Sequence, residues 1–182
     1  MQQYLLSLLI FIPLIAALFA FLIPSSSQTS FRWLSLLASV CQTGILIPLV
    51  VGYNASALPQ FVEQKPWIAL DLGTWGILKA EYFVAIDGLN ILFVCLTVGI
   101  MFLATLSSWT INKNVKGYFI LLLILNTAII GTFTALDFLL FYVFFEFMLL
   151  PMFFLIGMWG GPRREYASIK FFLYTLLGSI LI

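Results

Sequence analysis

Five successive runs of about twenty apolar residues limit the folds open to this chain more than any other feature. They cover residues 4–23, 31–52, 89–109, 118–136 and 138–159, and a shorter run covers 169–182. Each full run can cross the roughly 30 Å hydrocarbon core of a bilayer as an α-helix. With 63% apolar and 8% charged residues, the composition also lies far from that of soluble proteins. The sequence therefore predicts an all-α, polytopic transmembrane helix bundle, a single membrane domain over 1–182.

The last apolar run differs from the other five in length. It covers 169–182 and is followed by no cap, basic anchor or loop, whereas a crossing needs several more apolar positions. We therefore expect five complete helices and a truncated sixth, with the C-terminal remainder of a longer protein absent from this chain.

The basic residues gather at alternate connections between the runs. Six of the eight lie beside the first, third and fifth connections: Arg32, Lys113, Lys116, Arg163, Arg164 and Lys170. The long connection 53–87 is net acidic instead. Because basic loops tend to stay in the cytoplasm, we expect 53–87 to be an outward-facing loop and the N-terminus to face the periplasm or its equivalent.

Cofactor ligands are scarce in this sequence. It contains no histidine, and Cys41 and Cys95 stand alone in different apolar runs, so neither a haem nor an iron–sulfur pattern is present. No phosphate-binding glycine loop appears. We expect no cofactor and no metal bound by this chain, and the lipid bilayer, with no nucleic acid, among its partners.

One carboxyl group interrupts the fifth run. Glu146 is the only Asp, Glu, Lys or Arg in Phe138–Trp159, and an ionised acid in a bilayer costs at least a few kcal/mol, so such groups usually serve ion or proton movement. On the same helix, only the hydroxyl of Tyr142 is expected within reach of the Glu146 carboxyl group. Pro151 leaves the carbonyl of Phe147 without its helical hydrogen bond, which makes either a polar spot beside the acid or an ordinary kink.

Polar groups on the neighbouring runs are further candidates. Thr132 is expected at the depth of Glu146, and Asn126 lies nearer the cytoplasm on the same helix. They could hold water leading to the acid or make interhelical hydrogen bonds. Lys170 opens the sixth run, where it could gate entry or extend its amine to the interface.

An ordered set of motifs surrounds the acid. FFEFMLLPM is followed by FLIGMWGG, a basic turn and KFFLYT, and AIDGLNILFV stands upstream at 85–94. From Asp87 onward this set resembles the M-type antiporter-like subunits of proton-pumping NADH:quinone oxidoreductase, respiratory complex I. Before Asp87 the resemblance rests on hydropathy and topology.

The resemblance implies a subunit built of two inverted repeats of helices, with outward-facing termini, in a bacterial inner membrane or an organelle's energy-transducing membrane. In this family a glutamate of the fifth helix is essential for proton translocation and pairs with a lysine on a broken seventh helix. Glu146 occupies the glutamate position, and the lysine would lie beyond Ile182. The flavin, iron–sulfur clusters and quinone would belong to other subunits, and the partners would be L-type and N-type neighbours.

Two other functions stay open at this level. A subunit of a multi-subunit sodium/proton antiporter would share the glutamate. A scaffold bundle that transports nothing would hold Glu146 as a buried acid satisfied by its neighbours.

Overall fold

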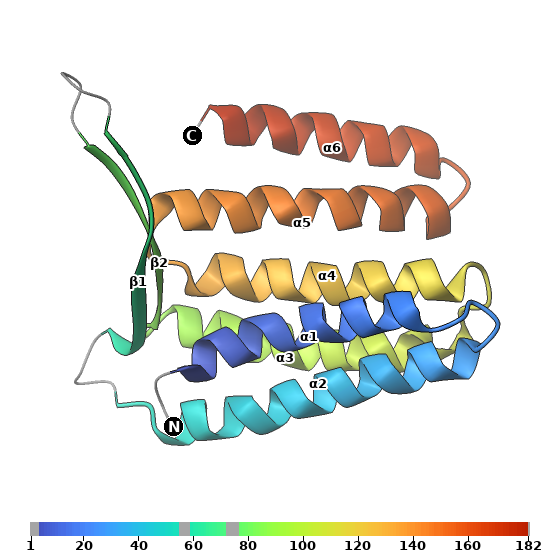
Figure 1. Ribbon diagram of the computed structural model, residues 1–182. Coiled ribbons are helices and arrows are strands. Elements are labelled where there is room, and N and C mark those ends of the chain that lie inside the picture. Colours follow the sequence, from blue (N-terminus) through green and yellow to red (C-terminus); the bar gives the residue numbers. More distant parts are fainter. Residues whose placement is uncertain (1–3, 55–58, 72–76, 182) are drawn as a thin grey trace.

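The computed structural model describes residues 4–54, 59–71 and 77–181. Within them, six α-helices lie side by side as a bundle, and a two-stranded antiparallel hairpin crosses one end (Figure 1). The helices are α1 (Leu5–Leu22), α2 (Gln28–Val51), α3 (Asn90–Ser107), α4 (Val115–Thr134), α5 (Phe138–Trp159) and α6 (Arg164–Ile180). A short 3-10 turn, η3 (Ser108–Thr110), follows α3. The expected fold class is confirmed.

Five of the helices, α1 to α5, are long and apolar enough to cross a membrane. α4 is the most enclosed of them, because it packs against α1, α2, α3 and α5. α5 lies between α4 and α6, and most of its surface is uncovered in this chain. The apolar side chains that α5 exposes therefore face lipid or another protein surface.

The segment 53–87, which the sequence predicted to be a loop, contains two β-strands. Most of it forms a hairpin of β1 (Gln60–Asp71) and β2 (Ile77–Ile86), with Leu70 paired to Leu78 and Gln60 paired to Ile86. The strands carry charged residues among apolar ones, so a search for long apolar runs passes over them. Val84 and Ile86 of β2 are buried in the core cluster of the bundle, and Ala85 between them is buried as well.

The hairpin also connects to the turn between α4 and α5. The backbone N–H of Leu136 donates to the carbonyl of Phe83 at 2.8 Å, and Val84 bridges Ala135. The hairpin therefore holds the start of α5, the helix that carries Glu146.

Two aspartates cap helices at the hairpin end of the bundle. Asp137 accepts a hydrogen bond from the N–H of Leu140 at 2.9 Å at the start of α5. Asp87 accepts one from the N–H of Asn90 at 2.7 Å at the start of α3. A carboxylate at a helix N-terminus pairs with free N–H groups and favours the helix dipole.

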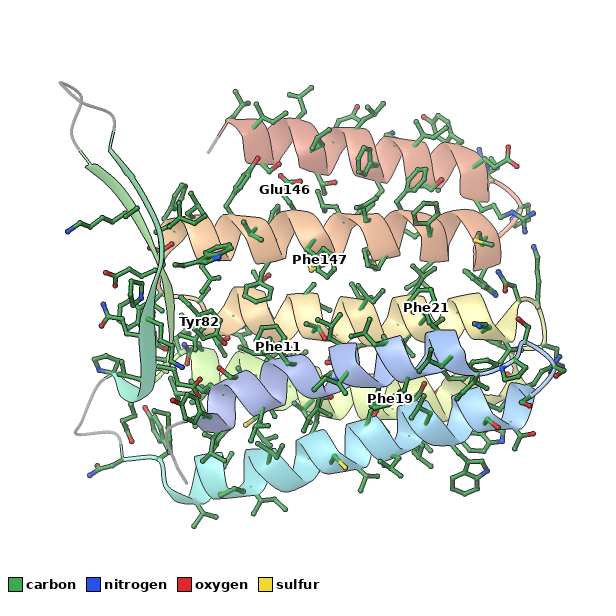
Figure 2. All side chains as sticks on the ribbon, in the orientation of Figure 1. Phe11, Phe19, Phe21, Tyr82, Glu146 and Phe147 are labelled. Atoms are coloured by element: carbon green, nitrogen blue, oxygen red, sulfur yellow. The ribbon has the colours of Figure 1, made fainter. Side chains whose placement is uncertain are left out.

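α1 receives its cap from a distant part of the chain. The carboxylate of Glu63, on β1, accepts hydrogen bonds from the N–H groups of Leu6 at 2.8 Å and Ser7 at 3.2 Å, and from the Ser7 hydroxyl. Tyr82, on β2 beside this site (Figure 2), shares a 2.8 Å hydrogen bond with the same hydroxyl. Glu63 is 6% exposed, so this buried acid is satisfied by hydrogen bonds.

Basic side chains occupy the opposite end of the bundle. The amine of Lys116 donates to the carbonyl of Ile23 at 2.8 Å, just after α1. Lys113 and Arg164 both donate to the carbonyl of Met158 near the end of α5, at 3.2 and 3.4 Å. The C-termini of α1 and α5 lie here, so cations meet the negative ends of the helix dipoles. Acid caps and basic caps thus mark opposite ends of the bundle.

Candidate functional site

Glu146 lies near the middle of α5, on the side that faces α6 (Figure 2). Its side chain is half-buried and accepts a hydrogen bond from the hydroxyl of Ser179 on α6. Ser179 is itself 3% exposed and also donates toward the carbonyl of Leu176 at 3.0 Å. The acid therefore has a neutral partner on the next helix, and no described cation makes an ion pair with it.

A groove opens along α5 beside the acid. It has a volume of about 430 Å³, and its lining is apolar except for Glu146 and one phenol. The lining residues are Tyr142, Val143, Glu146, Phe147, Leu150 and Phe172. The groove is large enough to admit water or a side chain from another segment of protein.

Lys170 does not lie beside Glu146. Its amine stands over the rings of Tyr166 and Tyr174, 5.7 and 5.6 Å from their centroids, on an exposed face of α6. Nine positions separate Lys170 from Ser179, which is about half a revolution of a helix, so the two side chains leave α6 on opposite sides. The role suggested for Lys170 remains a prediction.

Tyr142 and Pro151 lie on α5 with the acid. Tyr142 is one turn before Glu146 and lines the same groove, but the described part of the structure has no hydrogen bond between them. Pro151 is buried within α5 and cannot donate to the carbonyl of Phe147. An acceptor without its helical hydrogen bond is thus left one position after the acid.

The two polar residues expected on α4 are bonded elsewhere. The Thr132 hydroxyl donates to the carbonyl of Ala128 at 2.8 Å. Asn126 is buried and donates to the side chain of Gln42 on α2 at 2.6 Å, across the bundle from α5. Neither residue hydrogen-bonds to Glu146 within the described residues. A connection from either to the acid remains a prediction.

Sequence reasoning missed Ser179 and Gln42. Ser168 and Ser179 are both buried and lie eleven positions apart, which is close to three helical turns, so they share one face of α6. That spacing was the available signal for Ser179. Gln42 stands out as a polar residue in an apolar run. Within the described residues, no group of three or more His, Cys, Asp and Glu side chains is placed to hold a metal ion.

Comparisons with known proteins give one consistent result. The model of a family described as NADH:quinone oxidoreductase/Mrp antiporter, TM, matches residues 135–182. NADH-quinone oxidoreductase subunit M of Rhodobacter capsulatus is 41% identical over the whole chain, and NAD(P)H-quinone oxidoreductase chain 4 1 of Synechococcus elongatus is 37% identical over 96% of it. The chain spans 35% and 32% of these two relatives, or about a third of their length.

Two solved structures have a similar fold. A chain of respiratory complex I from Thermus thermophilus with bound NADH matches 96% of this chain with a TM-score of 0.74 and 26% identity, over 33% of its own length. A chain of the archaeal membrane-bound sulfane sulfur reductase matches 96%, with a TM-score of 0.68 and 22% identity, over 34% of its length. The second likeness is one of fold alone.

Proposed function

The chain belongs to the family of M-type, antiporter-like membrane subunits of NADH-quinone oxidoreductases, and from that membership we propose that it takes part in proton translocation, with Glu146 as the group that carries the proton. One observation carries the proposal. Glu146 is the only Asp, Glu, Lys or Arg of its helix, and it lies half-buried between α5 and α6 at an apolar groove.

The chemistry depends on the neutral partner of the acid. A hydroxyl group can donate to an ionised carboxylate, and it can also accept from a protonated one, so Ser179 stays bonded in both states. The balance between the two states is then open to control by a cation from another segment.

The cation belongs, in this proposal, to a lysine in the part of the full subunit that the chain does not cover. The apolar groove along α5 offers an approach for it beside Glu146. Lys170 points the other way on α6 and is therefore a poor candidate for this role. Approach of the lysine would favour the ionised carboxylate and release the proton, and its withdrawal would let the acid take up a proton again.

We further propose the setting in which this happens. The full subunit would assemble with L-type and N-type antiporter-like neighbours in an energy-transducing membrane, and it would couple quinone reduction elsewhere in the complex to proton transfer. Redox cofactors would be held by other subunits. The names of the relatives support this setting over a separate sodium/proton antiporter.

The distribution of charge supports an orientation for the chain. The end of the bundle with Lys113, Lys116 and Arg164 would face the cytoplasm or its equivalent, because basic segments are retained there. The hairpin end, with its acid caps, and the N-terminus would then face outward.

The test is Glu146→Gln in the full-length subunit within its complex. Proton pumping into membrane vesicles should fall to a small fraction of the wild-type rate, because an amide of the same shape cannot take up and release a proton. Glu165→Gln is the matched control, since Glu165 lies exposed in the first turn of α6. Undiminished pumping in Glu146→Gln would overturn the proposal and favour a scaffold role.

A further inference from the structure

Pro13 creates an unpaired acceptor inside α1. It has no N–H, so the carbonyl of Leu9, four positions earlier, lacks its helical hydrogen bond. The side-chain amide of Gln42, on α2, donates to this carbonyl at 2.9 Å. Gln42 is 1% exposed, so the bond lies in the interior of the bundle.

The same glutamine connects to a third helix. The Nδ2 group of Asn126, on α4, donates to Oε1 of Gln42 at 2.6 Å. This chain of bonds fixes both amides, because turning Gln42 over would set its oxygen against the Leu9 carbonyl. The oxygen of Asn126 must therefore point away from Gln42.

Neither Oδ1 of Asn126 nor the hydroxyl of Thr127 has a hydrogen-bond partner among the described residues, although the two side chains are 2% and 1% exposed. Both side chains are already buried within the helices of this chain, which leaves little room for a further protein segment to approach them. A small molecule with a hydrogen to donate is needed.

A second pair of unpaired groups lies on α2 toward the basic end. They are Nε of Arg32 and the hydroxyl of Ser35, which is fully buried. Between this pair and Gln42, the hydroxyl of Ser39 is satisfied by the Ser35 carbonyl at 2.9 Å and lies 3.3 Å from the Thr105 hydroxyl. The four α2 residues fall within an arc of about 80° and extend over about 15 Å. They form one polar stripe, from Arg32 to Gln42.

A buried polar group without a hydrogen-bond partner destabilises the folded state. Ordered water commonly satisfies such groups where it can bond to two to four of them. Lipid tails offer no hydrogen to donate. We propose that buried water lies at both ends of the polar stripe, one site at Oδ1 of Asn126 beside Gln42 and the other at Arg32 and Ser35. The stripe is separate from the groove at Glu146, which lies across α4 on the far side of α5.

The test is an experimental density map of the complete subunit, in its native complex, at a resolution that shows ordered water. Density is expected within hydrogen-bond distance of Asn126 Oδ1 and of Ser35 Oγ. Asn90 is the control in the same map, because it is also buried while its amide donates to Ala85 and accepts from Asp87. No water is expected at the Asn90 amide.

Absence of density at Asn126 in the wild-type map would overturn the proposal, whatever is found at Ser35. A protein donor on Asn126 Oδ1 would overturn it as well. In Asn126→Leu, the water beside position 126 should be lost while the water at Ser35 stays. Because the readout is density and not pumping, the result is independent of the role proposed for Glu146.

Discussion

The hydroxyl of Ser179 on α6 donates a hydrogen bond to the carboxylate of Glu146 on α5. The two residues are 33 positions apart in the chain, and this hydrogen bond joins the acid on α5 to the neighbouring helix. It holds the carboxylate in the space between α5 and α6, beside the groove from which a cation could approach. The position of the acid is therefore set by helix packing.

Removing the Ser179 hydroxyl should slow proton transport but not stop it, because the carboxyl group of Glu146 remains. A hydrogen bond to a charged group contributes about 1.5 to 3 kcal/mol, and each 1.4 kcal/mol is a factor of ten in rate if it bears on the limiting step. Ser179→Ala should therefore lower proton pumping of the full complex about tenfold, whereas Ser179→Thr, which keeps the hydroxyl, should restore most of it. Equal rates in Ser179→Ala and Ser179→Thr would show that the bond does not serve transport.

Loss of the long-range cap on α1 should destabilise the protein. Glu63→Ala leaves the N–H groups of Leu6 and Ser7 without an acceptor in a buried place, at a cost of about 2 to 4 kcal/mol. Glu63→Gln keeps one acceptor oxygen and should fall between Glu63→Ala and wild type. The thermal unfolding midpoint of the purified subunit measures both. An unchanged midpoint in Glu63→Ala would contradict the capping role.

Stability should depend on pH through Tyr82. Burial raises the pKa of its phenol above the ordinary 10.0; the Ser7 hydrogen bond opposes this rise and the charge of Glu63 adds to it. The unfolded chain thus loses this proton at lower pH than the folded protein. The contribution to stability is fully present below pH 10.0 and is lost as pH rises through the folded pKa.

The alkaline loss can be followed by thermal unfolding from about pH 9 to about pH 11. Tyr82→Phe removes the ionisable group, so its stability should fall less steeply over this range. An equally steep fall in the variant would assign the loss to other groups.

Close contact between α4 and α5 should make Gly131 intolerant of a side chain. A Cβ atom there would lie 2.4 Å from Cδ1 of Phe144, so Gly131→Ala forces the helices apart, at a cost of about 1 to 3 kcal/mol. Gly99, on α3, has nothing within 4 Å of the same position and supplies the matched control. Thermal unfolding should show a lower midpoint for Gly131→Ala and no loss for Gly99→Ala. Similar midpoints would mean that α5 can shift without cost.

Much of the fold could be predicted because each membrane-spanning helix is marked by a continuous apolar run in the sequence. The run Phe138–Trp159 was predicted with the same bounds that α5 has. The hairpin could not be predicted by the same means. Its strands are stabilised by contacts with residues far away, such as the 57-position separation between Glu63 and Leu6.

The candidate site was likewise predicted only in part from the sequence. Glu146 was found from the sequence, because a single carboxyl in an apolar helix is conspicuous by itself. Its partner on α6 was not found, and Lys170 was considered at the site although it faces the opposite side of that helix. Helical periodicity gives angles within one helix, but not the rotation of one helix against another.

The sequence by itself determined that this chain forms membrane-spanning helices and that one of them carries an acid, because hydrophobicity and charge act at each residue regardless of its neighbours in space. Tertiary structure alone decided which groups meet. It placed Ser179 against Glu146, and it placed Gln42 against the carbonyl that Pro13 left free. Such bonds join atoms on different helices, and they form only when packing sets the depth and rotation of both.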